Sequence, residues 1–284
     1  MEEADLIWMD GEQVPWDEAE VHVLTHALHY GTGVFEGIRC YDTVDAVYGI
    51  DIPYDQDKIR EAVLDLIRAN GLDACYIRPI VFHGYGEMGV DPGGNPVRVA
   101  IAVWPWGAYL GEEALSNGVD VMTSSWRKYR GDMIPASAKT TGAYVNSMLA
   151  TTEADEQGYR EAILLDAGGN VAEGPGENVF LVRDGTLVTP GPASSILEGV
   201  TRDSVMRIAR DHGREVVERP VSRGELYTAD ELFFTGTAAE VTPIRSVDDV
   251  EIGAGEITLD LQDAFFDVVD GSREEYADWL TWIQ

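Results

Sequence analysis

The stretch DMIPASAKTTGAYVN, residues 132–146, contains a lysine in a chain that has almost none. Asp132 is followed by no acidic residue until Glu153, so Lys139 lies among small and apolar residues. The chain has only two other lysines, Lys58 and Lys128, against 17 arginines. Burial among small residues favours the neutral amine, and a neutral lysine amine is a nucleophile suited to forming a Schiff base with a carbonyl. The alternative is an ordinary surface lysine.

The charge of the chain is extreme. Its 284 residues carry 51 acidic and 20 basic side chains, a net charge of -31, and the acidic residues are dispersed rather than gathered in a tail. Such a surface opposes binding to nucleic acid phosphates, which requires basic patches. Scarce lysine and dispersed carboxylates are typical of a halophile, where salt screens the self-repulsion. We therefore expect the protein to lose structure at low salt.

The composition also indicates a globular protein of the cytoplasm. No apolar run approaches the ~20 residues of a membrane-spanning helix, and the acidic start MEEADLIWMD is unlike a signal peptide. The two cysteines, Cys40 and Cys75, form neither a CxxC motif nor a disulfide framework, which favours a reducing compartment.

The first half of the chain predicts a small domain that mixes helix and strand. Residues 56–71 have the apolar spacing of a helix that stops at Gly71. Residues 74–86 and 97–106 are rich in β-branched and aromatic residues, as strands are. We place a small N-terminal α/β domain at 1–105 and a linker at 106–118.

The second half, residues 119–284, predicts a larger domain that contains Lys139. Strands are expected at 119–126 and 161–166, and residues 178–190 form a hairpin that turns at Asp184-Gly185. A helix is expected at 201–213 with Thr201 as its N-cap, a strand near 231–235 that ends in a turn, and a last helix at 258–271. Strands and helices do not alternate strictly, so the fold class is mixed α+β rather than one doubly wound sheet.

Three histidines could form a metal site near the N-terminus. His22, His26 and His29 lie at positions i, i+4 and i+7, on one face if this stretch is helical. No glutamate suited to act as a general base separates them. The alternative is a helix whose histidines form hydrogen bonds with their neighbours, and we favour it.

Two turns have the composition of ligand-binding loops. The stretch SSILEGVTRDSV, 194–205, leads a Gly-containing turn into a helix, whose free N–H groups could bind a phosphate. The stretch FFTGTAAEVTP, 233–243, contains only small residues from Gly236 to Ala239, which would let a ligand approach the backbone. Ordinary helix capping and a plain tight turn are the respective alternatives.

Charged residues in unusual surroundings provide two further candidates. Glu173 and Glu177 flank a Gly-Pro-Gly turn before a strand, where a carboxylate could hold a protonated ring nitrogen. Arg39 and Arg78 lie among apolar and aromatic residues, and such arginines meet the carboxylate of a partner residue or of a substrate. An exposed turn and structural ion pairs are the alternatives.

A lysine, an anion-binding turn, a carboxylate for a ring nitrogen and arginines for substrate are the parts of a pyridoxal 5'-phosphate (PLP) site. The chain resembles the branched-chain amino acid aminotransferases of the fold-type IV PLP group, a two-domain architecture with a small N-terminal and a large C-terminal domain. The resemblance runs from IWMDGE (7–12) to FFTGTAAEVTPIRSVD (233–248) and on into the last helix region. Its motifs are VHVLTHALHYGTGVFEGIRCY (21–41), YIRP (76–79), PWGAY (105–109), IPASAK (134–139), AEGPGENVF (172–180), TRD (201–203) and GTAAE (236–240).

The resemblance implies roles for individual residues. Lys139 would bind the cofactor aldehyde and move the α-proton, Tyr144 would hydrogen-bond the phenolic oxygen, and Glu173 the ring nitrogen. The cofactor phosphate would be surrounded by Leu197, Gly199, Val200, Thr201 and Thr237. The substrate α-carboxylate would be bound by Tyr76, Thr237 and Ala238, and the second carboxylate of glutamate by Arg78. The remaining substrate pocket would consist of Tyr30, Phe35, Arg39, Met88, Val90, Trp106 and Tyr109, some of them from a neighbouring subunit.

The chain departs from the family pattern in two places. After Asp42 it lacks a counterpart of the family's phosphate-binding arginine, and Ala143 replaces the usual asparagine. The resemblance implies an enzyme that moves the amino group of leucine, isoleucine or valine to 2-oxoglutarate, so its partners are amino acids and 2-oxo acids. It also implies a homodimer or a higher homo-oligomer. Alternatives are a D-amino acid aminotransferase or aminodeoxychorismate lyase on this fold, a metal-dependent hydrolase that uses the histidines, and a silent binding protein.

Overall fold

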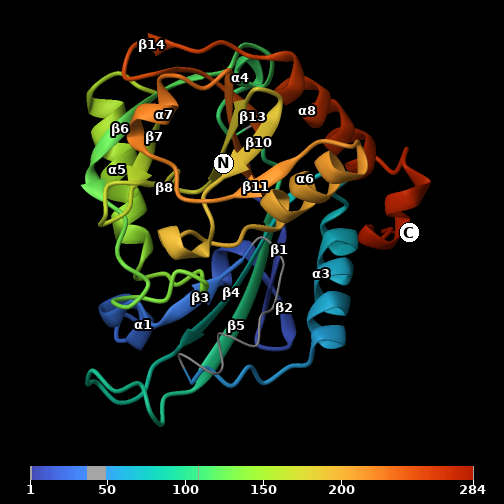
Figure 1. Ribbon diagram of the computed structural model, residues 1–284. Coiled ribbons are helices and arrows are strands. Elements are labelled where there is room, and N and C mark those ends of the chain that lie inside the picture. Colours follow the sequence, from blue (N-terminus) through green and yellow to red (C-terminus); the bar gives the residue numbers. More distant parts are fainter. Residues whose placement is uncertain (1, 37–48, 108, 284) are drawn as a thin grey trace. The chain divides into compact units, whose positions relative to one another are not determined.

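The computed structural model describes residues 2–36, 49–107 and 109–283. The chain divides into two compact units (Figure 1). Unit 1 comprises Met1–Trp106, Ala138–Tyr144 and Ile283, and unit 2 comprises Gly107–Ser137 and Val145–Trp282. This division differs from the expected one, because the segment that carries Lys139 belongs to unit 1 and not to the larger C-terminal part.

Unit 1 is built on a five-stranded antiparallel sheet. Its strands, in the order β2-β1-β5-β4-β3, are β2 (Glu12–Pro15), β1 (Leu6–Met9), β5 (Val97–Trp104), β4 (Tyr76–His83) and β3 (Gly33–Phe35). β4 and β5 lie within the strands predicted at 74–86 and 97–106. A short 3-10 helix, η1, covers Trp16–Glu18.

Helix α3 (Gln56–Asn70) covers one face of this sheet and confirms the helix predicted at 56–71. Asp55 caps it by accepting the Lys58 N–H at 2.8 Å, and Gly71 ends it with a left-handed φ of 61°. Its buried face includes Leu66 and Ile67, which pack with Val99, Ile101 and Val103 of β5 and with Trp8 of β1. This apolar contact is the core of unit 1.

The histidine helix is shorter than expected. Helix α1 covers only His26–Tyr30, so His22 lies outside it and the three histidines do not share one helical face. Their ring nitrogens are occupied by local partners: His22 Nδ1 accepts the Leu24 N–H, and His29 Nε2 donates to the Val23 carbonyl. No group of three or more potential metal ligands occurs among the described residues. The geometry therefore contradicts a three-histidine site on one helix.

Unit 2 contains a nine-stranded mixed sheet. The order is β11-β10-β9-β12-β13-β6-β7-β8, with β14 paired to β13. Their bounds are β6 (Val119–Arg127), β7 (Glu161–Leu165), β8 (Val171–Glu173), β9 (Asn178–Arg183), β10 (Thr186–Thr189), β11 (Val216–Glu218), β12 (Glu231–Gly236), β13 (Glu240–Val247) and β14 (Val250–Glu251). Two separate sheets, one of them antiparallel, confirm the mixed α+β class.

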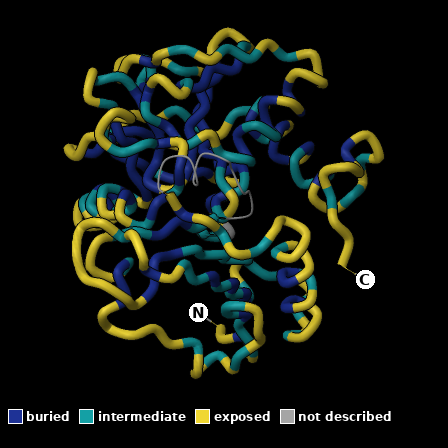
Figure 2. The backbone as a smooth tube through the Cα atoms, turned by 90° about the horizontal axis from the view of Figure 1, so that it is seen from below, coloured by how far each residue is buried: buried dark blue, intermediate teal, exposed yellow. Residues whose placement is uncertain are grey.

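Both faces of the unit 2 sheet are buried. Along β9, Val179 and Leu181 join one apolar cluster while Phe180 and Val182 join another on the opposite face. Phe180 and Phe233 stack at 4.9 Å in the second cluster. β7 and β9 are buried along almost their whole length, and Figure 2 colours such buried stretches of the backbone dark blue. Burial on both sides explains why these strands are almost continuously apolar.

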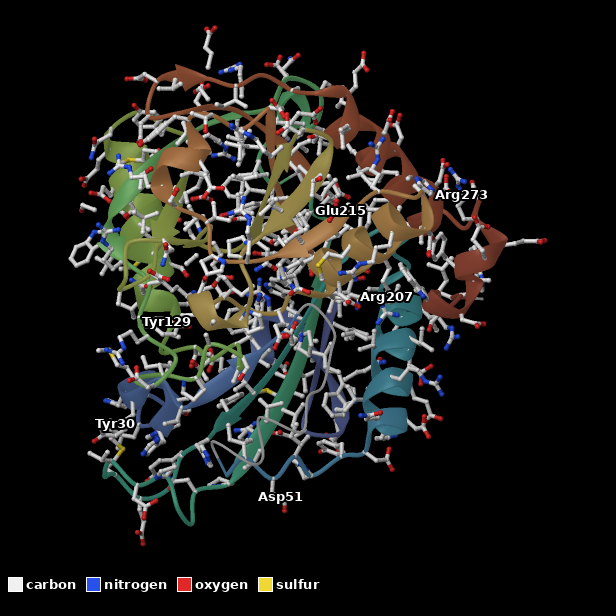
Figure 3. The ribbon with its side chains drawn as sticks, viewed as in Figure 1. Tyr30, Asp51, Tyr129, Arg207, Glu215 and Arg273 are labelled. Carbon is white, nitrogen blue, oxygen red and sulfur yellow. The ribbon has the colours of Figure 1, made fainter. Side chains whose placement is uncertain are left out.

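Two helices were predicted in this part of the chain, at 201–213 and 258–271, and both are present among the five helices of its described residues. Their bounds are α4 (Glu112–Asn117), α5 (Tyr144–Glu156), α6 (Val200–Asp211), α7 (Arg223–Leu226) and α8 (Glu256–Val269), with 3-10 helices η2 (Pro192–Ser194) and η3 (Glu274–Trp279). α6 and α8 pack on β12. In Figure 3 the label of Arg207 marks α6, and this guanidinium lies 5.9 Å from the Trp279 ring of η3.

Two details of unit 2 bear on the predictions. The β9–β10 hairpin turns at Asp184 and Gly185, with φ of 49° and 77°, as expected for an Asp-Gly turn. Thr201, however, is not the N-cap of α6: the helix begins at Val200 and Gly199 is its N-cap.

The predicted linker at 106–118 contains α4. No helix among the described residues has the length and apolarity needed to cross a membrane.

Candidate active site

The lysine segment is attached to the edge of the unit 1 sheet. The Phe35 N–H donates to the Lys139 carbonyl at 3.1 Å, and the Thr141 N–H donates to the Gly33 carbonyl at 2.9 Å. Val34 and Thr140 face each other in an isolated antiparallel bridge. Residues 139–141 therefore continue the sheet beyond β3, which fixes the backbone of Lys139 against Phe35.

A close contact between two glycines completes this attachment. The Gly31 carbonyl accepts hydrogen bonds from the Thr141 hydroxyl at 2.9 Å and from the Gly142 N–H at 3.2 Å. Gly31 has a φ of 63°, and a Cβ on it would lie 2.6 Å from Gly142 Cα. A side chain at Gly31 would push the lysine segment off the sheet, so glycine is required there.

The Lys139 side chain is half-buried and lies between two aromatic rings. Its Nζ is 5.5 Å from the centroid of Phe35 and 5.4 Å from that of Tyr144, and the two rings contact each other edge to face at 4.7 Å. Within the described part of unit 1, Lys139 forms no ion pair. Its amine therefore lies against aromatic rings rather than against a carboxylate of this unit.

Arg78 is surrounded by aromatic rings rather than by carboxylates. Its guanidinium carbon lies 4.9 Å from the Phe35 centroid, 5.0 Å from that of Tyr76 and 5.7 Å from that of Trp104, and its Nη2 donates to the Tyr76 hydroxyl at 3.0 Å. Its Nε is buried and has no hydrogen-bond partner among the described residues. A buried donor without a partner is costly, so Arg78 is suited to bind an anionic ligand.

Aromatic residues extend from Arg78 along the sheet. The Tyr76 ring lies 5.0 Å from Trp104 and 4.6 Å from Trp106, and the two tryptophans lie 5.7 Å apart. The fold thus brings together Phe35, Tyr76, Trp106 and Tyr144 of the predicted site with Arg78 and Lys139. Trp104 was not predicted as a site residue, because the sequence around it is typical of a buried strand. It is 7% exposed.

Tyr30, Met88 and Val90 form a separate group on unit 1. The Tyr30 ring lies 4.5 Å from His26, whose Nε2 donates to the Gly89 carbonyl at 2.7 Å, and His26 Nδ1 accepts from the Thr32 hydroxyl. Tyr30, Met88 and Val90 are 43%, 44% and 84% exposed. Figure 3 labels Tyr30 at α1. Among the described ring contacts of unit 1, none joins these three side chains to the aromatic residues around Arg78.

In unit 2 the central feature is the buried carboxylate of Glu173. It lies at the end of β8, and its Oε1 forms an ion pair with Lys128 Nζ at 2.6 Å. Its Oε2 accepts hydrogen bonds from Asn178 Nδ2 at 3.0 Å and from the Leu197 N–H at 2.9 Å. Both oxygens are thus held by donors from three separate segments. Glu177, the other predicted carboxylate, is also buried, and its Oε2 accepts the Gly176 N–H.

The start of α6 lies beside this carboxylate. Asn178 Nδ2 also donates to the Leu197 carbonyl at 2.8 Å, and a Cβ on Gly199 would lie 2.4 Å from Asn178 Oδ1. Gly199 provides no side-chain cap, so the first N–H groups of this 12-residue helix have no capping side chain. Free helix N–H groups bind anions. Of the predicted phosphate residues, Leu197, Gly199, Val200 and Thr201 lie at this helix start.

The second small-residue turn joins β12 and β13. Thr237 is exposed and Ala238 half-buried, so their backbone is accessible, and Thr242 Oγ1 supports the turn by donating to the Ala239 carbonyl at 2.6 Å. In the strand before it, Thr235 is paired with Asn178 of β9 and is 1% exposed. The Thr235 hydroxyl has no partner among the described residues. Because directly paired residues share a sheet face, this free hydroxyl lies on the Asn178 side.

Unit 2 also contains residues that the sequence did not single out as site residues. Lys128 and Asn178 contact Glu173, and Thr235 pairs with Asn178. Only the rarity of lysine could have indicated Lys128. Tyr109 is half-buried against the unit 2 core, and its carbonyl accepts from Arg160. Arg39 lies outside the described residues, as do residues 43–48 at the start of the region in which the family carries its phosphate-binding arginine.

Each unit, taken by itself, has groups suited to PLP. The buried Glu173 carboxylate suits a ring nitrogen, the uncapped start of α6 suits a phosphate, and the orphaned hydroxyl of Thr235 suits a further polar atom. In unit 1, Lys139 and Tyr144 provide an amine and a phenol within contact of each other. These residues fit the cofactor by chemical type.

Comparisons with known proteins agree with this reading. The family described as Amino-transferase class IV matches residues 38–247. The branched-chain-amino-acid aminotransferase of Pseudomonas aeruginosa is 47% identical over 300 positions, covering 98% of this chain and 97% of the relative. Because 300 exceeds the 284 residues of this chain, the relative has residues without a counterpart here.

Two solved structures resemble the whole chain. The branched-chain amino acid aminotransferase of Escherichia coli is 45% identical with a TM-score of 0.96, and 99% of this chain and 100% of that chain are covered. The branched-chain amino acid aminotransferase of Thermobaculum terrenum, solved in its PLP form, is 36% identical with a TM-score of 0.91, and both chains are fully covered.

Proposed function

Because the chain belongs to the class IV amino-transferases, we propose that it is a branched-chain amino acid transaminase that uses PLP. It transfers the amino group of L-leucine, L-isoleucine or L-valine to 2-oxoglutarate, in two half-reactions at one site. The observation that carries this proposal is the environment of Lys139. Its backbone is bonded to the edge of the unit 1 sheet, and its side chain lies between the rings of Phe35 and Tyr144. It forms no ion pair with the described residues of unit 1. Relatives at 46–47% identity bear the same enzyme name.

The chain's own residues have separate tasks in this reaction. Bound PLP supplies the electron sink that stabilises negative charge at the substrate α-carbon. We assign to Lys139 Nζ the attachment of the cofactor and the movement of the α-proton. Tyr144 hydrogen-bonds the phenolic oxygen, and Glu173 holds the ring nitrogen. The helix start formed by Leu197, Gly199, Val200 and Thr201, together with Thr237, binds the phosphate.

The substrate requires both apolar and cationic surroundings. We assign Tyr76, Thr237 and Ala238 to the α-carboxylate that all substrates share. Phe35 and Trp106 offer apolar surface to a branched side chain, and Arg78 offers its partnerless Nε to the second carboxylate of glutamate. An apolar pocket with one cation at its edge accepts both kinds of side chain in turn. Arg39 and Tyr109 remain predicted members of this pocket.

The experiment that tests the proposal is reduction of the protein with borohydride after incubation with PLP in high salt. We expect absorbance of a bound cofactor before reduction and, afterwards, a stable pyridoxyl group on the peptide that contains Lys139. Turnover of L-leucine with 2-oxoglutarate, compared with D-alanine, tests the substrate. A protein that acquires the label at Lys58 or Lys128, or nowhere, would contradict the proposal.

We further propose that the protein is a homo-oligomer with shared sites. Tyr30, Met88 and Val90 were predicted to line the substrate pocket, yet they are exposed on unit 1 together with Val23 and Leu28. Exposed apolar groups of this kind are typical of interfaces between proteins. A monomeric mass in solution, measured by light scattering at high salt, would refute this assembly.

We also propose that the protein acts in the cytoplasm of a halophile. The net charge of -31 and the presence of only three lysines support this origin, and Cys75 is a free thiol. Salt screens the repulsion between dispersed carboxylates, so the midpoint of thermal unfolding should rise with KCl concentration. A midpoint that is independent of salt would contradict the halophilic origin.

A further inference from the structure

The ion pair between Lys128 and Glu173 is unusual for this chain. Its Nζ–Oε1 distance is 2.6 Å, and the two side chains are only 7% and 6% exposed. Elsewhere among the described residues, the salt bridges are formed by arginine and include at least one partner that is more than a quarter exposed. Burying both charges is expensive and seldom adds net stability. The pair therefore calls for a reason other than stability.

The backbone of Lys128 is fixed where its side chain can reach the carboxylate. The Lys128 N–H donates to the Leu165 carbonyl at the end of β7, at 2.9 Å. β8, which ends at Glu173, pairs with β7. Lys128 and Glu173 therefore extend from neighbouring parts of one sheet. Because both backbones are fixed there, the distance between Nζ and Oε1 can vary little.

The hydrogen bonds of Glu173 are unevenly divided between its two oxygens. Oε2 accepts from Asn178 Nδ2 and the Leu197 N–H, whereas the described contacts of Oε1 consist of Lys128 Nζ. A carboxylate offers roughly four acceptor positions, so Oε1 retains the capacity to accept one more donor. Lys128 determines the orientation of this oxygen, because the amide donors hold only Oε2.

We propose that Lys128 is a positioning residue for the cofactor: it orients Glu173 Oε1 toward the ring nitrogen of bound PLP. This inference rests on the proposed function, in which Glu173 holds that nitrogen. Lys128 acts through Glu173 and does not itself exchange protons with the substrate. The same rarity of lysine that marks Lys139 thus marks a second residue of the site, while Lys58 lies exposed in the first turn of α3.

The test compares K128M, K128R, E173Q and the double variant K128M/E173Q, with K58M as a matched control on α3. Affinity for PLP is measured by quenching of tryptophan fluorescence, and kcat and KM are measured for L-leucine. By analogy with residues that orient metal ligands, we expect K128M to weaken PLP binding about 10- to 100-fold. It should lower kcat while KM for leucine changes by less than about 3-fold. K128R, which keeps the charge, should restore both, and K58M should match the parent protein.

The double variant separates positioning from a structural role. If Lys128 acts through Glu173, then K128M should change PLP affinity less than about 2-fold when it is added to E173Q, a non-additive result. Equal, additive losses in both backgrounds would overturn the proposal, as would a K128M protein that binds PLP like K58M. K128M/E173Q contains no unpaired buried charge, so it remains informative even if K128M alone does not fold.

The parent protein shows which claim fails. If it neither binds PLP nor transaminates leucine, the proposed function is wrong and the role of Lys128 is wrong with it. If it does both and carries the label on Lys139, while K128M and K128R behave like K58M, then only the role of Lys128 is refuted.

Discussion

Replacement of Lys139 by arginine is expected to lower kcat for L-leucine by about 10⁴-fold or more, since one group supplies both attachment and proton movement. A guanidinium stays protonated and is not a nucleophile, so K139R cannot attach the cofactor covalently. The cation itself is kept, and with it the contact to the rings of Phe35 and Tyr144. We therefore expect normal folding and a specific loss of chemistry, measured by steady-state kinetics and by borohydride labelling.

Two controls sharpen this result. K58R alters an exposed lysine that belongs to α3 and should leave kcat unchanged. In K139A, a small primary amine such as methylamine can take over part of the proton movement, so added amine should raise kcat in proportion to its concentration. Retention of more than about a tenth of the parent kcat in K139R would exclude Lys139 from the chemistry.

Local features of the fold could be predicted because their causes are local. The α3 helix has an apolar stripe and a Gly71 stop, and the structure places both as expected, whereas its Asp55 cap was not predicted. The β9–β10 turn follows from Asp184-Gly185, which tolerates positive φ. Errors arose at helix starts: α6 begins one residue before Thr201, and α1 is too short to contain His22. Each boundary depends on a cap or a strand contact that apolar periodicity does not encode.

The candidate site was predictable in its residue types and not in its arrangement. The Lys139 carbonyl accepts the Phe35 N–H and the Thr141 N–H donates to the Gly33 carbonyl, so the lysine segment is bonded to residues more than 100 positions earlier in the chain. No pattern around Lys139 indicates that pairing. Lys128 was equally rare in the sequence, but its neighbours Arg127 and Arg130 give it the appearance of a surface residue. Its burial against Glu173 depends on how β6, β7 and β8 are paired.

A buried carboxylate outside the proposed site should make stability depend on pH. Glu161, at the start of β7, is 1% exposed and accepts from the Thr151 hydroxyl and the Ala162 N–H. Burial raises its pKa from 4.5 to about 7, although these hydrogen bonds oppose the shift. Between these two pH values the unfolded chain loses the proton that the folded protein keeps. The free energy of unfolding therefore falls as pH rises through this window.

Replacing Glu161 by glutamine should remove this loss, because the amide has the same shape and does not ionise. At about pH 4 the variant and the parent should be similar, whereas at about pH 8 E161Q should be more stable by ~3 kcal/mol, from the difference between pKa values of 4.5 and about 7. Denaturant unfolding at constant high salt measures the free energy of unfolding of each protein. Other carboxylates titrate in the same way in both, so their contribution cancels in the difference.

Glu153 provides a control of opposite sign. Burial acts to raise its pKa, but hydrogen bonds from the Ser124 hydroxyl and from Ser125 lower it overall. Its contribution to stability is present above pH 4.5 and is lost as the pH falls below that value, so E153Q should be less stable than the parent at neutral pH.

If E161Q and the parent keep a constant difference from acidic to mildly alkaline pH, the Glu161 carboxyl does not hold its proton in the folded protein. The charge would then be stabilised by Thr151 and the Ala162 N–H, despite its burial.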